Sequence, residues 1–381
     1  MLAELLARLT GAALFEYISF RAALAAFTSF VVALALGGPT IRWLRKHRVG
    51  EDVTKTAALE LAQLSQNMGK HQTTTMGGSF LVTALLTGVL LWCRLDNVAV
   101  VIAMVIVAGM AAVGFVDDYQ KLTVKSSNGM SERSKLLGQT IVSVACLGAF
   151  VWYARASGRF SLLELHPPFL KDWSLPLGES VLGALAFTFL GWLVIAGTAN
   201  ATNITDGMDG LLAGCTVASG GALAVFCYVT GRFDWTEYLN LPYVPEAAEM
   251  AVVGGALVGA ALGFLWFNAF PAAVFMGDSG SLPIGGLLGW MALVAKQELV
   301  LPLIGAVFFL ELGSIWLQRF WYKRSGGRRV FTMAPIHHGL QLKGGIFRPG
   351  PKPWHEVTVV VRAWIIAAVC ATASLALMKV R

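Results

Sequence analysis

Long apolar runs separated by short polar segments occupy most of this chain. A helix needs about 20 mostly apolar residues to cross the roughly 30 Å hydrocarbon core of a bilayer. Runs of about this length are found at residues 17–38, 76–93, 97–116, 136–154, 178–198, 207–230, 247–267, 280–295, 298–317 and 357–378. The pattern predicts an all-α polytopic membrane protein with about ten transmembrane helices, built as a single domain over residues 1–381.

The first run is expected to stay in the membrane as an anchor. It is too long for the apolar core of a signal peptide, and Glu4, Arg8 and Glu16 precede it instead of a basic segment. Residues 1–16 are expected to form a short helix at the membrane interface.

Composition supports the same class of protein. The chain is 56% hydrophobic and only 13% charged, whereas about 25% of the residues in a soluble domain are charged. In a soluble protein the net charge of +7 would suggest nucleic-acid binding. Here the placement of the basic residues is better explained by the orientation of the chain in a membrane.

The distribution of Lys and Arg predicts the orientation in the membrane. Ten spans put both termini on one side and divide the loops into two sets. One set holds 18 of the 29 basic residues, and its loops are 39–75, 117–135, 199–206, 268–279 and 318–356. Because cytoplasmic loops carry the excess of Lys and Arg, this set is predicted to face the cytoplasm, with both termini periplasmic and no nucleic-acid partner.

Two patterns of small residues are interpreted as packing features. Gly255, Gly259 and Gly263 recur every four residues in the seventh run, a spacing typical of close contact between membrane helices. The five cysteines lie singly in or beside apolar runs, so they are expected to be small core residues and not zinc ligands.

Acidic residues at the ends of the runs are the first candidates for chemistry, because charge at the edge of hydrocarbon is expensive. Asp117 and Asp118 end the third run, and Lys121 and Lys125 follow at helical spacing. Two such carboxylates can supply a proton acceptor and a group that orders a metal ion or a phosphate. The alternative is a solvated helix end with an i,i+4 Asp and Lys pair.

A second polar group lies between the fifth and sixth runs. Asn200, Asn203, Asp206 and Asp209 follow one another at spacings of three, which suit one face of a helical turn. The adjacent glycines allow the backbone to approach a ligand closely. Asp206 or Asp209 could instead cap the sixth helix, but capping does not explain four such residues together.

A third group precedes the eighth run and contains Asn268, Phe275 and Asp278. Asp278 could hold Mg²⁺, which prefers one or two carboxylates together with water and substrate phosphates, and Phe275 could stack on a nucleobase. The alternative for Asp278 is an N-cap of the eighth helix.

Two further segments suit phosphate binding. His337 and His338 lie in the long basic loop after the ninth run; consecutive histidines point apart on a helix, so zinc is not expected. Lys70 and Thr75 precede the second run, where lysine could contact a phosphate or attract the loop to anionic lipid.

Two polar residues lie within and just beyond the ninth run. Glu311 and Gln318 are seven residues apart and share one helix face. They could belong to the site or form a polar contact between helices.

Five of these polar segments lie at the ends of apolar runs, and the predicted topology puts all five on the same positively charged side. They contain Lys70 and Thr75, Asp117 and Asp118, Asn200 to Asp209, Asn268 to Asp278, and His337 and His338. Acidic metal ligands surrounded by lysines and amides suit an anionic substrate such as a nucleotide diphosphate. A position at the membrane edge further suggests that one substrate is a lipid.

In order and spacing, these motifs resemble the phospho-N-acetylmuramoyl-pentapeptide-transferase family, within the polyprenyl-phosphate N-acetylhexosamine-1-phosphate transferase superfamily. The match covers nearly the whole chain and reads TMGG, DDxxK, NxxDGxDG, FN followed by FMGDSGSL, and APIHH. The resemblance implies Mg²⁺-dependent transfer of phospho-MurNAc-pentapeptide from UDP-MurNAc-pentapeptide to undecaprenyl phosphate, which yields lipid I and UMP. It also implies a homodimer in the bacterial cytoplasmic (inner) membrane.

The resemblance further implies a role for each matching residue. Asp278 would hold the Mg²⁺, Asp117 would deprotonate the lipid phosphate, and Asp118 would assist at the same place. His337 would take part in catalysis at the sugar-phosphate end, beside His338. The other matching residues would bind uridine, diphosphate or phosphate groups: Lys70, Thr75, Lys121, Lys125, Lys135, Asn200, Asn203, Asp206, Asp209, Asn268, Phe275 and Gln318.

The chain departs from the family pattern in two places. Gly339, Leu340 and Gln341 follow the histidine pair, where the family has a third histidine, an aromatic residue and an acid. Thr73 to Thr75 replace a TPT segment. These departures affect the expected sugar and peptide contacts more than the metal site.

Two alternatives belong to other activities. A related enzyme transfers GlcNAc-1-phosphate from UDP-GlcNAc to the same lipid phosphate, but the APIHH segment favours the muramoyl-pentapeptide substrate. An ion-coupled transporter would carry its acids near the midplane of the membrane. Here the acids lie at run ends on one side, and no inverted repeat is evident.

Overall fold

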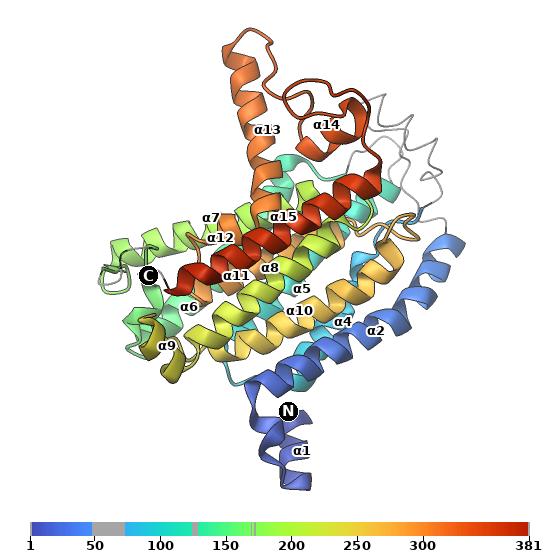
Figure 1. Ribbon diagram of the computed structural model, residues 1–381. Helices are drawn as coiled ribbons and strands as arrows, with labels where there is room; N and C mark the ends of the chain where they lie inside the picture. Colours follow the sequence, from blue (N-terminus) through green and yellow to red (C-terminus); the bar gives the residue numbers. More distant parts are fainter. Residues whose placement is uncertain (1, 48–72, 124–128, 169, 171–172, 380–381) are drawn as a thin grey trace.

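The long helices of the chain lie side by side in one bundle (Figure 1). The computed structural model describes residues 2–47, 73–123, 129–168, 170 and 173–379. Within these residues seven helices are long and apolar enough to cross a membrane: α2 (Ile18–Lys46), α5 (Val98–Thr123), α6 (Glu132–Ala156), α7 (Val181–Thr205), α8 (Leu211–Thr230), α10 (Ala247–Asn268) and α15 (Glu356–Ala376). The prediction of a mostly helical, multi-pass chain is therefore confirmed.

The other predicted runs form shorter or less apolar helices, namely α4 (Gly78–Trp92), α11 (Asp278–Val294), α12 (Leu301–Ile304) and α13 (Ala306–Arg324). The ninth run is not one helix, because it breaks at Gly305 between α12 and α13. Beyond the break, α13 rises away from the bundle (Figure 1). Ten complete spans and the side on which the termini lie remain predictions.

Short elements connect the long helices. They are α1 (Leu2–Thr10), η1 (Ala13–Glu16), η4 (Phe160–Leu163), α9 (Phe233–Leu239), α14 (Ile336–Lys343) and η5 (Leu377–Lys379). A small antiparallel pair joins β1 (Glu164–Leu165) to β2 (Leu175–Pro176). The helix expected near the N-terminus is present as α1.

Helix α11 lies at the centre of the bundle. Each of its residues from Asp278 to Val294 is buried, and the helix packs against α4, α5, α7 and α8. A helix that is apolar on all sides belongs in a core. Asp278, as the first residue of α11, is therefore placed where the ends of several helices meet.

The glycine stripe of α10 brings this helix against α2. A Cβ at Gly255 or Gly259 would overlap the backbone carbonyl of Ala22 or Ala26, and one at Gly263 would overlap Ala33. The prediction that these glycines serve close helix packing is confirmed.

A buried ion pair joins α2 and α10 near their N-terminal ends. The guanidinium of Arg21 donates from Nη1 to Glu249 Oε2 at 2.7 Å and from Nη2 to Glu249 Oε1 at 2.5 Å. Arg21 also donates to the carbonyl of Trp92, and the backbone N–H of Arg94 donates to Glu249. A bidentate pair with further hydrogen bonds fixes the geometry of the helices that it joins.

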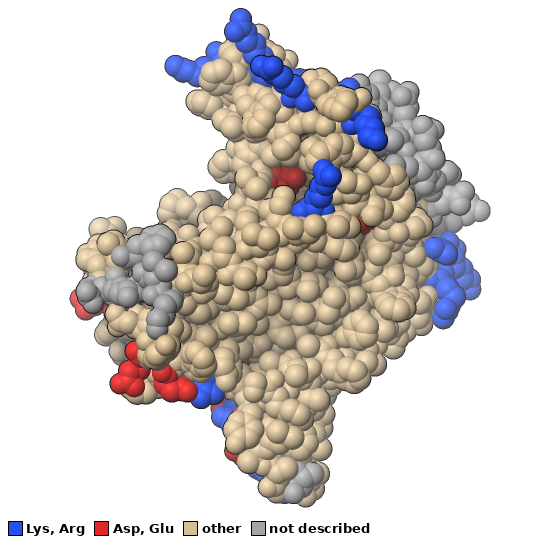
Figure 2. Space-filling model, viewed as in Figure 1, with Lys and Arg blue, Asp and Glu red and all other residues tan. Residues whose placement is uncertain are grey.

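Charged side chains gather at the two ends of the molecule (Figure 2). Lys and Arg stand out around α13 and α14, and the last turn of α13 contributes Lys323 and Arg324. Asp and Glu stand out at the other end, around α9, which contains Asp234 and Glu237. The basic end is the end toward which α5 and α10 run and from which α11 starts.

Candidate active site

Close backbone contacts bring the acidic helix ends together. Gly114 in α5 faces the backbone carbonyl of Asp278, and Gly78 in α4 faces the backbone of Gly280. A Cβ at either glycine would overlap main-chain atoms of α11, so the absence of a side chain allows these helices to meet. The acidic end of α5 is thereby placed against the first turn of α11.

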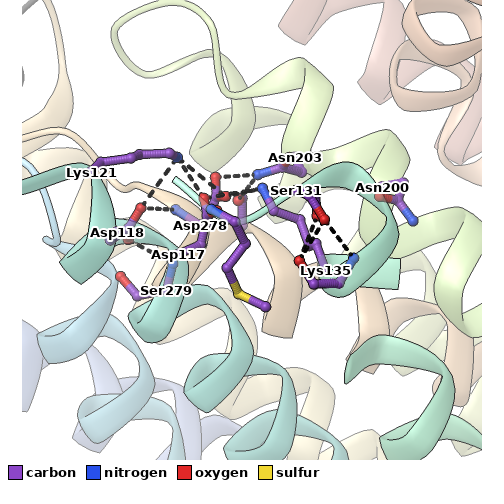
Figure 3. Close-up of polar contacts among 12 residues, drawn as sticks. Asp117, Asp118, Lys121, Ser131, Lys135, Asn200, Asn203, Asp278 and Ser279 are labelled. Atoms are coloured by element: carbon purple, nitrogen blue, oxygen red, sulfur yellow. Dashed lines mark hydrogen bonds and ion pairs between the residues drawn. The ribbon is translucent and has the colours of Figure 1, made fainter. Parts of the chain in front are cut away.

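Three buried carboxylates form the centre of the site (Figure 3). Asp117 is 0% exposed, Asp118 is 2% exposed and Asp278 is 7% exposed. One carboxylate oxygen from each lies within 4.8 Å of the others. Carboxylate oxygens are the hard donors that Mg²⁺ and similar divalent cations prefer, so the residues fit such an ion.

Two lysines reach the carboxylates from different helices (Figure 3). The Nζ of Lys121, in α5, lies 2.7 Å from Asp117 Oδ2 and 3.3 Å from Asp278 Oδ2. The Nζ of Lys135, in α6, contacts Asp278 Oδ2 and lies 3.1 Å from Asp117 Oδ2. Two ammonium groups therefore offset part of the charge of three carboxylates, and they could also hold substrate phosphates.

The two neighbouring aspartates have different surroundings. The carboxylate of Asp118 accepts the backbone N–H groups of Asp278 at 3.2 Å and Ser279 at 3.0 Å, so it caps the first turn of α11. Asp117 Oδ1 accepts the N–H of Met130 at 2.6 Å. Asp117 Oδ2 is buried and faces the ammonium groups of Lys121 and Lys135. The i,i+4 pair with Lys121 exists, but the alternative of a solvated helix end is wrong because both aspartates are buried.

Helix α7 supplies Asn203 to the acidic centre. Its Nδ2 donates to Asp278 Oδ1 at 2.6 Å and to Ser281 Oγ at 2.9 Å. Asn200, one turn earlier, pairs instead with Gln139 of α6, donating from Nδ2 to Oε1 at 2.7 Å. Both asparagines lie on the helix, because α7 continues to Thr205, beyond the predicted end of the fifth run.

Neither aspartate of the loop between α7 and α8 caps α8. Asp206 ends α7 as its C-cap, and Gly210 is the N-cap of α8 without a side-chain bond. Asp209 Oδ2 accepts the N–H of Ala272 at 3.0 Å instead. The N-cap alternative is wrong for Asp278 as well, since it is the first residue within α11 and Gly277 precedes it as the cap.

Two buried side chains fix this loop from other helices. Asn268 accepts the N–H of Gly210 at 3.0 Å and donates to the carbonyl of Val274 at 2.9 Å. Glu356, the first residue of α15, accepts the N–H of Asp209 at 2.9 Å and the side-chain amide of Gln341 at 3.2 Å. The segments around Asp209, Asn268 and α14 therefore form one connected structure.

The segment before α4 pairs with the segment before α11. The N–H of Phe275 donates to the carbonyl of Thr74 at 2.7 Å, and the N–H of Gly77 donates to the carbonyl of Phe275 at 2.9 Å. Thr75, between them, is buried. The hydrogen bonds bring together two predicted segments that are about 200 positions apart in the chain.

The polar residues of α13 contact the loop that leads into α14. Gln318 Oε1 accepts the N–H groups of Val330 at 2.9 Å and Phe331 at 3.0 Å. Glu311 contacts the first turn of α14, where the rings of His337 and His338 lie 4.2 Å apart between centroids. Both residues therefore make polar contacts beyond their own helix, and a role for them in the site stays a prediction.

The structure unites six of the predicted residues directly, namely Asp117, Asp118, Lys121, Lys135, Asn203 and Asp278. Lys70 and Lys125 lie outside the described residues. Sequence reasoning gave no role to Glu356 or Gln341, because an acid at the start of an apolar run and a glutamine in a polar loop are both ordinary there.

Comparisons with known proteins give a consistent result. The family described as "Glycosyl transferase family 4" matches residues 98–296. A phospho-N-acetylmuramoyl-pentapeptide-transferase of Maridesulfovibrio salexigens is 40% identical, over 96% of this chain and 95% of its own. A protein of the same name from Neisseria gonorrhoeae is also 40% identical, over 98% of this chain and 97% of its own.

Proposed function

Because the chain belongs to the phospho-N-acetylmuramoyl-pentapeptide-transferases, within glycosyl transferase family 4, we propose that it has their activity. The reaction moves phospho-MurNAc-pentapeptide from UDP-MurNAc-pentapeptide to undecaprenyl phosphate, and forms lipid I and UMP for peptidoglycan synthesis. The observation that carries the proposal is the buried group of Asp117, Asp118 and Asp278 in a chain with full-length similarity to these enzymes. The relatives' names favour this activity over GlcNAc-1-phosphate transfer or ion-coupled transport.

Asp278 would hold Mg²⁺, with Asp117 and Asp118 completing the acidic group around it. Asn203 and Lys135 already orient the Asp278 carboxylate, as supporting groups commonly do for metal ligands. When bound, the ion would offset negative charge on the diphosphate of the UDP-linked substrate.

Asp117 is the group that we assign to the acceptor lipid. Its Oδ2 lies beside the ammonium groups of Lys121 and Lys135, which would hold the incoming lipid phosphate next to it, so this oxygen can take the phosphate proton. A phosphate oxygen of the lipid then attacks the phosphorus that carries the sugar. The bond from that phosphorus to the oxygen of UMP breaks, and UMP leaves.

Lys121 and Lys135 would stabilise the phosphates during this exchange. Both ammonium groups contact the carboxylates of Asp117 and Asp278. Positive charge therefore lies beside the place where the phosphate oxygens would bind. Preorganised charges of this kind act most strongly where water is excluded. Asn200, Asp206, Asp209, Asn268, Phe275 and Gln318 remain our proposals for the uridine and diphosphate pocket, with Thr75 and His338 at its edges.

The orientation follows from the charges. We place the end with α13 and α14 in the cytoplasm of a bacterium, since the basic side chains gather there (Figure 2). The enzyme would then take its nucleotide substrate from the cytoplasm and its lipid from the cytoplasmic (inner) membrane. We also propose a homodimer, from the family resemblance.

Substrate identity is tested by measuring UMP release in detergent with undecaprenyl phosphate and Mg²⁺. UDP-MurNAc-pentapeptide and UDP-GlcNAc are supplied in parallel reactions. The proposal predicts UMP from the muramoyl-pentapeptide substrate only. UMP released from UDP-GlcNAc alone would contradict it and favour the GlcNAc-1-phosphate transferase.

A further inference from the structure

His337 is buried at the start of α14, although its imidazole ring is polar. Its side chain is 2% exposed, and neither ring nitrogen forms a hydrogen bond with the described residues. The Nδ1 atom lies 3.3 Å from Glu311 Oε1, within the distance of an ion pair. A buried polar atom without a partner is costly, so the Nε2 atom suits contact with a bound molecule.

Glu311 of α13 holds the helix on which His337 lies. Its Oε2 accepts the N–H of Ile336 at 2.6 Å, and its Oε1 accepts the N–H of His337 at 3.2 Å. The first N–H groups of a helix lack partners within the helix and carry partial positive charge. Glu311, which is 6% exposed, therefore holds the backbone at the start of α14 and lies beside the ring of the same histidine.

The other side of the histidine ring faces the loop between α7 and α8. A Cβ at Gly207 would overlap His337 Nε2 and lie 3.4 Å from His338 Nε2. Gly207 belongs to the same segment as Asp206 and Asp209, which we assign to the substrate. The geometry thus points Nδ1 toward Glu311 and Nε2 toward that segment.

We propose that Glu311 is a positioning residue for His337, an inference that rests on the proposed function. By attracting the Nδ1 proton, the carboxylate selects the tautomer in which Nε2 is an unprotonated hydrogen-bond acceptor. By accepting two backbone N–H groups at the start of α14, the carboxylate also fixes the position of the imidazole ring relative to Gly207. His337 then presents Nε2 to the sugar-phosphate part of the UDP-linked substrate.

A double-mutant cycle tests this inference through the rate of UMP release. Glu311→Gln keeps the size of the side chain and one acceptor oxygen, but it removes the charge that orients the ring. We expect it to lower kcat by about 10- to 100-fold, the effect typical of partners that orient a functional histidine. In a His337→Ala background the same change is expected to have no further effect.

Additive losses in the cycle would overturn the inference, because Glu311 would then act independently of His337. If UMP release by His337→Ala is too slow to measure, the cycle uses the equilibrium Kd of UDP-MurNAc-pentapeptide instead of kcat. If Glu311→Gln does not fold, Glu311→Asp takes its place. Thermal unfolding is followed for each variant, since a purely structural role would lower stability and leave no coupling.

Ser314→Ala is the matched control. Ser314 is buried on the same helix one turn away and donates to the carbonyl of Glu311, so its loss is expected to leave kcat unchanged. An inactive wild-type protein would contradict the proposed function itself. An active wild type with a fully active Glu311→Gln variant would contradict only the role of Glu311.

Discussion

Adjacent residues in this chain have different tasks, as Asp117 and Asp118 illustrate. The carboxylate of Asp118 accepts two backbone N–H groups of α11. Asp117 Oδ2 lies beside the ammonium groups of Lys121 and Lys135, at 2.7 Å and 3.1 Å. A carboxylate whose two oxygens both accept backbone N–H groups is expected to support folding, and one that faces two lysine side chains is expected to support chemistry.

Asparagine variants separate these two tasks. Asp118→Asn is expected to lower the free energy of unfolding by about 1–3 kcal/mol, because the amide nitrogen cannot accept a backbone N–H. Asp117→Asn is expected to slow UMP release by about 100-fold or more, since the proton acceptor is lost. Thermal unfolding and UMP release are measured on both proteins. Equal stability losses with equal residual activity would contradict the assignment.

The acids of the candidate site could be found from the sequence because charge at the end of an apolar run is costly. Glu356 could not be found in this way. It looks like an ordinary acid in the first turn of a helix, and its contact with the N–H of Asp209 spans 147 positions. The hydrogen bonds of Asp118 could not be predicted either, because any residue except proline can donate a backbone N–H and the sequence does not show which one does.

At the scale of elements, apolar runs predicted where helices lie but not how they pack. Run 280–295 resembles the others in composition, yet the helix that it forms, α11, is buried along its whole length. Its contacts depend on Gly78 and Gly114, whose role appears only when the partner helices are known. The break at Gly305 was also missed, because the residues on both sides remain apolar and the hydropathy does not change there.

The packing of α5 against α11 is tested by adding one methyl group. Gly114→Ala would place a Cβ against the carbonyl of Asp278, and overpacking of this kind typically costs about 1–3 kcal/mol. The rate of UMP release should also fall, because the added methyl group displaces Asp278 from its position in the site. Gly148→Ala in α6 is the control, since nothing lies within 4 Å of its Cβ. Similar unfolding temperatures and activities in both variants would argue against this packing.

The molecule as a whole has a basic end with the candidate site and an opposite end braced by the buried ion pair of Arg21 and Glu249. The basic end was foreseen from the Lys and Arg count of the loops, because charge follows sequence position once the helices are known. Arg21 and Glu249 were not foreseen as partners, since 228 positions separate them.

The bracing by Arg21 and Glu249 should affect stability without affecting chemistry. Glu249→Ala leaves a buried guanidinium without its carboxylate, which typically costs about 3–5 kcal/mol. The unfolding temperature in detergent should fall, while KM for UDP-MurNAc-pentapeptide stays the same in the folded fraction. Asp234→Ala breaks the exposed pair with Arg232 and should leave the unfolding temperature unchanged. A drop of the same size in both variants would refute the special role of the buried pair.

The central claim is that the three-aspartate group carries metal-dependent transfer of phospho-MurNAc-pentapeptide. The most direct measurement is UMP release from UDP-MurNAc-pentapeptide and undecaprenyl phosphate, with the wild type and Asp278→Asn each assayed with Mg²⁺ and with a chelator. The account predicts UMP only from the wild type with Mg²⁺. Full activity of folded Asp278→Asn, or of the wild type in chelator, would contradict it.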